Sequence, residues 1–289
     1  LPLTLFPYTT LFRSVVIYGL GHIGGSLALS IRKNLSKTHK VTGIDINMTT
    51  LRRIKEKKLF KVAKAETKQA AFILSNADLV FVCVSPSNIE DVFKIINKNN
   101  TKKTLIVSDV ASIKHSVVSL AKKHLKKISF VGGHPIAGTE KSGFQNADPN
   151  LFKNKIFIIS GSHGTKKSIG TISSIWRKLG TRVLTLDPKK HDKVFAYLSH
   201  LPHALSFCLN KTALKSFSKN DIEKFGGSSY KDYSRISSSS DRLWTEIFLS
   251  NKKNLTSSLD DSIKFLTSLK DALSKGSSAD VAKLIKTIN

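Results

Sequence analysis

Residues 15–24 of this 289-residue chain read VVIYGLGHIG, and their pattern indicates the fold class. The apolar residues at its start predict a buried strand, and the glycines after them have the spacing G-x-G-x-x-G where the strand passes into a helix. Gly19 permits the tight turn, Gly21 lets the backbone approach a pyrophosphate, and Gly24 lets helix and strand pack closely. The stretch therefore predicts a dinucleotide-binding turn, with the free N–H groups of the helix start facing the phosphates.

A second strand is expected at residues 41–45 and ends in Asp45, about 20 residues after the last glycine. A carboxylate there accepts hydrogen bonds from the ribose hydroxyls of a dinucleotide and repels a 2′-phosphate. NAD is therefore the expected cofactor, with His22 and Ile23 completing the glycine turn. The alternative is a structural glycine turn followed by a capping aspartate.

Short apolar runs alternate with helix-like segments up to about residue 186. This alternation predicts an α/β domain with a Rossmann-type, doubly wound sheet. The expected strands are residues 15–19, 41–45, 78–84, 104–110, 128–133 and 155–160. Ser85 and Pro86 follow the third of these runs, where such folds line the cofactor crevice; a helix-capping role is the alternative.

The strand signal disappears after residue 187, and helical spacing follows. We expect a long helix over residues 191–211 that Pro202 kinks or breaks, and a Ser- and Gly-rich connection over residues 228–240. Further helices are expected at residues 243–249, 255–269 and 281–288. The predicted organisation is an NAD-binding domain, residues 15–186, followed by an all-helical domain, residues 187–289.

Residues 1–14 are set apart from this organisation. Their sequence, including TLFPYTTLFRS at residues 4–14, resembles the translation of a short sequencing adapter. They lack the charged start and the small-residue cleavage site of a secretion signal. We expect a non-native leader here, with natural sequence beginning near Val15.

The formal charge of +27, from 47 basic and 20 acidic residues, raises the question of nucleic-acid binding. The lysines are scattered, however, and no recognition motif accompanies them, so we expect no nucleic-acid partner. Cys83 and Cys208 both lie in apolar stretches and are expected to be buried free thiols in a reducing cytoplasm. No apolar run approaches the roughly 18 residues that a membrane span needs, so we expect no membrane association.

Four segments resemble the prephenate dehydrogenase family, which includes arogenate dehydrogenases. They are SDVASIK (108–114), GGHPIAGTEKSGF (132–144), SHLPH (199–203) and YKDYSRISSSSDRLW (230–244). With the glycine motif they extend over nearly the whole chain after the leader, and GGHPIAGTEKSG is too long and specific to expect by chance. The resemblance implies a homodimer formed through the helical domain, which also closes the active site.

The resemblance assigns His134 to the ring hydroxyl of the substrate. The chemistry agrees independently, because hydride transfer from the carbinol carbon needs a base for the hydroxyl proton, and a neutral imidazole with an ordinary pKa of about 6.5 suits that role. Ser112 matches the family serine that hydrogen-bonds the histidine or the hydroxyl, although Ala111 stands where the family usually has glycine. A structural loop histidine and a helix-capping serine are the alternatives.

The resemblance also implies a substrate-binding set. Arg235 would hold one of the two carboxylates of prephenate through paired hydrogen bonds that lysine could not reproduce. Ser199 and His203 are spaced to share a helix face, and Trp244 would shape the same pocket or pack in a core. The predicted set is Ser199, His203, Arg235, Trp244, Thr139 and Glu140.

The implied reaction is the oxidative decarboxylation of prephenate to 4-hydroxyphenylpyruvate in tyrosine biosynthesis, with hydride transfer to NAD⁺ and without a metal. Arogenate, converted to tyrosine, is the alternative substrate, and feedback inhibition by tyrosine stays open. A β-hydroxyacid-type dehydrogenase is less favoured, since that family places a catalytic lysine on its helical domain, where this chain has SHLPH and the Arg235 segment. A non-catalytic NAD sensor is the remaining alternative.

Overall fold

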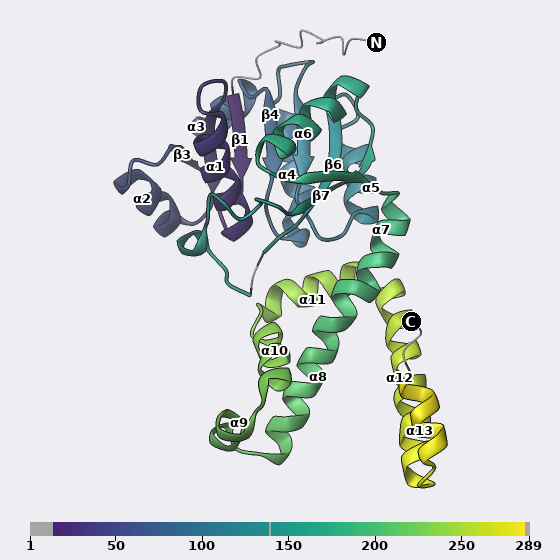
Figure 1. The fold of residues 1–289 in the computed structure, drawn as a ribbon. Coiled ribbons are helices and arrows are strands. Elements are labelled where there is room, and N and C mark those ends of the chain that lie inside the picture. Colours follow the sequence, from purple (N-terminus) through teal and green to yellow (C-terminus); the bar gives the residue numbers. More distant parts are fainter. Residues whose placement is uncertain (1–13, 139, 287–289) are drawn as a thin grey trace, which may run out of the picture. The chain divides into compact units, whose positions relative to one another are not determined.

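The computed structural model describes residues 14–138 and 140–286 (Figure 1), so the expected leader lies outside the described residues except for Ser14. The chain divides into two compact units. The first runs to His191 and also contains Ser239–Glu246; the second comprises Asp192–Ser238 and the chain from Ile247 onward. The domain boundary expected at residues 186 and 187 stays a prediction.

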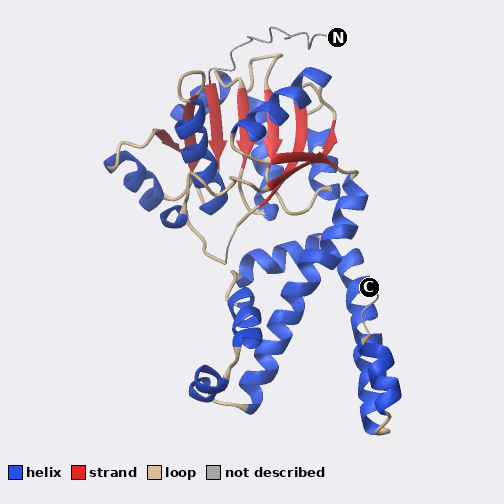
Figure 2. Cartoon of the chain, viewed as in Figure 1, coloured by secondary structure: helices blue, strands red, loops and turns tan. Residues whose placement is uncertain are grey.

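The described strands of the first unit form one eight-stranded sheet (Figure 2) of order β3-β2-β1-β4-β5-β6-β7-β8. Neighbouring strands are parallel except β6 and β7, which are antiparallel. The predicted Rossmann-type α/β class is confirmed. The strands are β1 (Ser14–Tyr18), β2 (Lys40–Asp45), β3 (Lys61–Lys64), β4 (Leu79–Val82), β5 (Ile106–Asp109), β6 (Ser129–Ile136), β7 (Ile156–Ser162) and β8 (Arg182–Thr185).

The sequence patterns missed β3 and β8, which lie at the two edges of the sheet. Their sequences, KVAK and RVLT, are four residues long and carry charge. Short, charged strands are typical of sheet edges, where they discourage pairing with other chains. The central strands are recognisable because both of their faces are buried and they read as continuous apolar runs.

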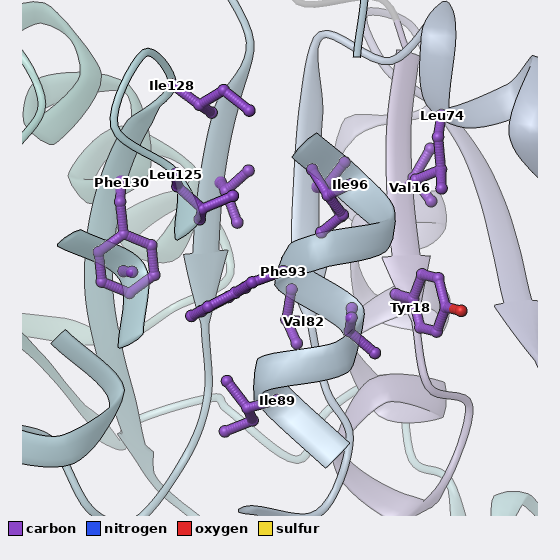
Figure 3. Close-up of a cluster of buried hydrophobic side chains, with 14 of the residues drawn as sticks. Val16, Tyr18, Leu74, Val82, Ile89, Phe93, Ile96, Leu125, Ile128 and Phe130 are labelled. Atoms are coloured by element: carbon purple, nitrogen blue, oxygen red, sulfur yellow. The ribbon is translucent and has the colours of Figure 1, made fainter. Parts of the chain in front are cut away.

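Helices cover both faces of the sheet. On one face lie α1 (His22–Leu35), α2 (Met48–Glu56) and α6 (Lys166–Lys178), packed with Val15 and Ile17. On the other lie α3 (Lys68–Ser75), α4 (Ile89–Asn99) and α5 (His115–His124), packed with Val16 and Tyr18. Figure 3 shows the second core, where Phe93 of α4 meets Phe130 of β6 edge to face, with ring centroids 5.6 Å apart. This two-sided burial makes the sheet a rigid support for the loops at its strand ends.

The remainder of the described chain is helical, as predicted. Two helices, α7 and α11, cross between the compact units. None of the described helices is long and apolar enough to cross a membrane. The helices are α7 (Pro188–Phe195), α8 (Leu201–Ser216), α9 (Lys219–Phe225), α10 (Ser228–Ser237), α11 (Asp241–Ser250), α12 (Lys252–Ser274) and α13 (Ser278–Ile285).

Two predictions about these helices had different outcomes. The irregularity expected near Pro202 is confirmed, because a π-helical turn at Ala196–His200 lies between α7 and α8 and places Pro202 in the first turn of α8. The connection expected at residues 228–240 is wrong, since most of it forms α10. This helix packs on α8, where the Tyr230 hydroxyl donates to Asn210 Oδ1 at 2.7 Å, so tertiary contacts outweigh its serine-rich sequence.

Candidate active site

The glycine turn between β1 and α1 has the geometry that a dinucleotide needs. Gly19 has a φ of +97°, and a Cβ there would lie 2.5 Å from the carbonyl oxygen of Cys83. A Cβ on Gly24 would collide with the carbonyl oxygen of Gly19. A Cβ on Gly21, in contrast, would meet nothing within 4 Å, so the backbone there faces open space where a pyrophosphate can approach. The three glycines therefore fit the cofactor that they predict.

Asp45 ties the end of β2 to this turn. Its Oδ2 accepts a hydrogen bond from the Leu20 backbone N–H at 2.6 Å, and its Oδ1 accepts from the Asn47 N–H at 2.7 Å. Each carboxylate oxygen can accept a second bond, and the side chain is only partly buried, so ribose hydroxyls remain acceptable partners. Ile46, which follows, is 72% exposed and offers no charge to a 2′-phosphate.

Other predicted cofactor residues lie on the loops around the turn. Ser85 begins the short helix Pro86–Asn88 after β4, and its Oγ accepts from Asn88 Nδ2 at 2.9 Å. His22 Nδ1 lies 3.1 Å from the carbonyl oxygen of Lys141, on the loop that follows His134. The loop that follows the predicted base thus contacts the start of α1, directly after the glycine turn.

His134 lies on β6 opposite Ile158 of β7, and its side chain is buried. Its Nδ1 is 2.9 Å from Nε2 of His191, a fully buried histidine of α7 in the same compact unit. The ring centroids are 5.1 Å apart with an interplanar angle of 63°. A hydrogen bond at Nδ1 fixes the ring orientation and links its tautomer to that of its neighbour.

Ser112 lies in the turn after β5, and a buried ion pair frames that turn. Asp109 and Lys114 form this pair, and neither side chain has any solvent exposure. Asp109 Oδ2 also accepts from the Ala111 backbone N–H at 2.9 Å. Ala111 is not among the described non-glycine residues with positive φ, so alanine is accommodated where the family usually has glycine.

The predicted substrate residues are distributed over both compact units. Ser199, His203 and Arg235 lie in the second, and the buried Trp244 and half-buried Glu140 belong to the first. Thr139 lies outside the described residues.

Within the second unit, His203 Nδ1 is 2.8 Å from the Ser199 carbonyl oxygen. Burial lowers the pKa of His203, and this hydrogen bond opposes that shift only in part. Arg235 is exposed on α10, with a guanidinium nitrogen 4.0 Å from Asp232 Oδ1.

Three buried polar residues near His134 were missed by the sequence reasoning: Asp109, Lys114 and His191. The ion pair of Asp109 and Lys114 could have been predicted from the sequence. Asp109 ends an apolar strand, and Lys114, of opposite charge, follows in the next turn, where the two can pair. No comparable signal marks His191, since 57 residues separate it from His134.

Two other predictions concern reactive groups. Cys83 is partly buried, and burial followed by the nearby charge of Asp109 raises its pKa. Cys208 is exposed, so the expectation that both thiols are buried is wrong. Among the described residues, no three His, Cys, Asp or Glu side chains gather as a metal site would require.

A doubly wound sheet with this glycine turn is typical of dinucleotide-binding enzymes, and the buried histidine on the same sheet is a candidate proton acceptor. Residues 27–185 match the sequence model of the prephenate dehydrogenase nucleotide-binding domain, and residues 187–287 match that of the prephenate dehydrogenase dimerization domain. The chain belongs to the prephenate dehydrogenase family. It is an NAD-dependent dehydrogenase.

Individual relatives agree with this membership. Prephenate dehydrogenase of Bacillus subtilis is 26% identical over 95% of this chain and 74% of its own length. The crystal structure of prephenate dehydrogenase from A. aeolicus, in complex with hydroxyphenyl propionate and NAD⁺, is 30% identical, with a TM-score of 0.85 and 94% of each chain covered. Arogenate dehydrogenase of Synechocystis is 26% identical, with a TM-score of 0.75 over 94% of this chain and 96% of its own.

Proposed function

We propose that this protein converts prephenate to 4-hydroxyphenylpyruvate in tyrosine biosynthesis, with release of carbon dioxide and reduction of NAD⁺. The observation that carries the proposal is the placement of His134. It is buried on the sheet that bears the dinucleotide turn, its Nδ1 bonds His191, and its loop reaches His22 of that turn. A proton acceptor and a hydride acceptor are thereby held by one rigid support.

In this proposal His134 takes the proton of the substrate hydroxyl as the carbinol carbon is oxidised. Because Nδ1 bonds His191, we assign Nε2 to the hydroxyl. Bound NAD⁺ supplies the hydride acceptor. The ring carboxylate leaves as carbon dioxide, its bonding electrons complete the aromatic ring, and the proton held by His134 returns to the ring oxygen to give the phenol of the product. Proton, hydride and carboxylate are then all accounted for, and the chain supplies orientation and a base.

Separate roles are proposed for Ser112 and for the predicted substrate-binding residues. Ser112 would hydrogen-bond the hydroxyl or His134, and Arg235 would bind one substrate carboxylate with its forked guanidinium. The lowered pKa of His203 favours a neutral ring that can hydrogen-bond the substrate without adding a charge. Ser199, Trp244, Thr139 and Glu140 would shape the pocket, and Ser85, Pro86 and Ile23 would line the cofactor.

The direct test is to incubate the purified protein with NAD⁺ and either prephenate or arogenate, and to quantify NADH, carbon dioxide and the aromatic product. We expect prephenate to give equal amounts of all three. Turnover of arogenate alone would transfer the assignment to the other substrate. No turnover of either, with NAD⁺ still bound, would contradict the proposed reaction.

We further propose that the second unit forms a homodimer, as the dimerization domain of its family implies. Helix α12 carries Ile263, Phe265 and Leu266 with exposures of 58%, 45% and 54%. Exposed apolar groups of this kind are typical of a surface that a partner covers. Sedimentation velocity should show a dimer, and Phe265→Glu should weaken it; a monomeric parent protein would contradict the proposal.

We propose tyrosine as an inhibitor, because it carries a phenol ring and a carboxylate, as the proposed product 4-hydroxyphenylpyruvate does. We expect added tyrosine to raise the apparent KM for prephenate, and an unchanged KM at millimolar tyrosine would contradict this.

We propose a cytoplasmic location. Both cysteines are free thiols, as is usual for proteins of a reducing compartment.

A further inference from the structure

We propose that Asp109 and Lys114 are positioning residues that hold His134 and Ser112 in place for the reaction. This inference rests on the proposed function, which makes His134 the base and Ser112 its neighbour. Its basis is a set of contacts that converge on Gly133, the residue before His134. Asp109 Oδ1 accepts from the Gly133 N–H at 3.0 Å, and Lys114 Nζ donates to the Gly133 carbonyl oxygen at 2.7 Å.

These contacts occur where the pairing of β6 with β5 stops, while its antiparallel pairing with β7 continues from Gly133 to Ile136. The register between β5 and β6 ends at Ser108 and Val131, and the register between β6 and β7 shifts between Val131 and Gly133. On the side that faces β5, Gly133 therefore lacks the ladder of hydrogen bonds that regular pairing would supply. The Asp109 and Lys114 side chains replace it, one on each polar group of Gly133. Together with the pairing to β7, they therefore set the direction in which the chain enters His134.

Packing around Gly133 leaves this segment little room to adjust. A Cβ on Gly133 would collide with the ring of Phe157 and would lie 2.8 Å from the carbonyl oxygen of Asp109. The backbone is thus pressed between β5 and β7, and the two side-chain contacts select one arrangement of its peptide groups. A small shift here would displace the imidazole, to which proton transfer is sensitive.

The same carboxylate also holds the turn that carries Ser112. Asp109 Oδ2 accepts from the Ala111 N–H at 2.9 Å, and Oδ2 is also the atom that contacts Lys114. The turn is therefore closed at both ends around Ser112 by one buried pair. Asp109 is the common partner of both loops, so it sets the position of Ser112 relative to His134.

Burial of the pair supports a role beyond stability. Both side chains have zero solvent exposure, and a buried ion pair commonly contributes no more to stability than apolar residues of similar volume. What it offers in addition is directional hydrogen bonding in a site of low dielectric. Here those bonds go to the backbone beside the two candidate catalytic side chains.

The test uses Lys114→Gln in the full-length protein. Glutamine keeps a donor but loses the charge and the reach of the ammonium. The matched control is Lys102→Gln, because Lys102 Nζ also contacts an aspartate, Asp78 Oδ1 at 2.6 Å, and a backbone carbonyl, that of Asn76 at 2.7 Å. Asp78 lies just before β4, at the opposite ends of the strands from Asp109. Asp109→Glu is the second variant, should Lys114→Gln fail to fold.

We expect Lys114→Gln to lower kcat about 10- to 100-fold with the Kd for NAD⁺ unchanged, and Lys102→Gln to leave both unchanged. In a His134→Asn background, Lys114→Gln should change kcat less than about twofold, because its effect passes through His134. Equal losses in both backgrounds, or a normal kcat in Lys114→Gln, would overturn the proposal.

A second readout does not depend on turnover. The imidazole signals of His134, assigned in NMR spectra by their loss in His134→Asn, should shift in Lys114→Gln and stay in place in Lys102→Gln. Unshifted signals in Lys114→Gln would refute the positioning role even if the parent protein turned over neither substrate. The NMR signals therefore test the positioning role of Lys114, and turnover separately tests the proposed reaction.

Discussion

Nδ1 of His134 and Nε2 of His191 lie 2.9 Å apart inside the first compact unit. One proton shared between these atoms determines which nitrogen of each ring is protonated. When His134 accepts the substrate proton on Nε2, its Nδ1 must donate, and His191 is the acceptor beside it. The pair thus links the orientation of the base to its capacity to take a proton.

Replacing His191 should therefore impair catalysis more than binding. We expect His191→Phe, which keeps an aromatic ring but removes the acceptor, to lower kcat about 10- to 100-fold, by analogy with partners that orient metal-binding histidines. The KM for NAD⁺ should change little. His163→Phe is the matched control, since His163 is also packed within the first unit. Its ring is stacked on that of Phe130, with the two ring centroids 5.7 Å apart. A normal kcat in His191→Phe would show that the contact has no catalytic role.

Arg235→Lys should raise the KM for prephenate and leave kcat largely intact. Lysine keeps the positive charge but cannot form two parallel hydrogen bonds to a carboxylate. Loss of one of these charged hydrogen bonds should weaken substrate binding by about 1.5–3 kcal/mol. Steady-state kinetics measure the change, with Arg182→Lys on the edge strand β8 as a control of the same chemistry. If the KM of Arg235→Lys equals that of the parent protein, Arg235 does not bind the substrate.

Asp45→Asn should narrow the preference for NAD⁺ over NADP⁺. The amide keeps an oxygen for the Leu20 N–H but removes the charge that repels a 2′-phosphate. The ratio of kcat/KM for the two cofactors should therefore fall by about tenfold or more, equivalent to about 1.4 kcal/mol. Asp91→Asn, a change on the exposed face of α4, should leave the ratio as it was. An unaltered ratio in Asp45→Asn would place the source of cofactor selectivity elsewhere.

The Glu90 cluster on α4 and α5 predicts a pH-dependent contribution to stability. Hydrogen bonds from Lys123 and then His124 lower the pKa of Glu90 from 4.5 to about 2. Because the folded pKa is depressed, this contribution is present above pH 4.5 and is lost as the pH falls through about 2. Glu90→Gln should therefore melt below the parent protein at neutral pH, by an amount that shrinks with acid and with added salt.

Melting curves measured between pH 3 and 7 test this expectation. Glu56→Gln, which alters an exposed carboxylate at the end of α2, serves as the control. A melting difference for Glu90→Gln that stays constant over the whole range would contradict the assignment of the effect to this carboxylate.

Much of the fold could be predicted because its signals are local. The glycine turn, the central strands and the helical second part all follow from apolar periodicity and from residues that punctuate it. Edge strands β3 and β8 were not predicted, because their short, charged sequences carry little apolar signal. Helix α10 was not predicted, because packing on α8, and not its serine-rich sequence, determines its conformation.

The residues of the candidate site likewise fall into those that the sequence predicted and those that it did not. His134, Ser112 and Arg235 could be proposed from motifs, and Asp45 from its distance to the glycine turn. The residues that orient them were not foreseen. His191 reaches His134 only through the folded chain, and the Gly133 contacts of Asp109 and Lys114 depend on a register shift that no sequence pattern marks.

NADH formation from prephenate by the parent protein and by His134→Asn, measured with the Kd of each for NAD⁺, shows whether His134 is the base of this reaction. We predict turnover by the parent protein, a loss of about 10²- to 10⁴-fold in kcat for His134→Asn, and the same Kd for both. A parent protein that forms no NADH from prephenate would contradict the proposed reaction, and a His134→Asn variant as active as the parent would contradict the role of His134.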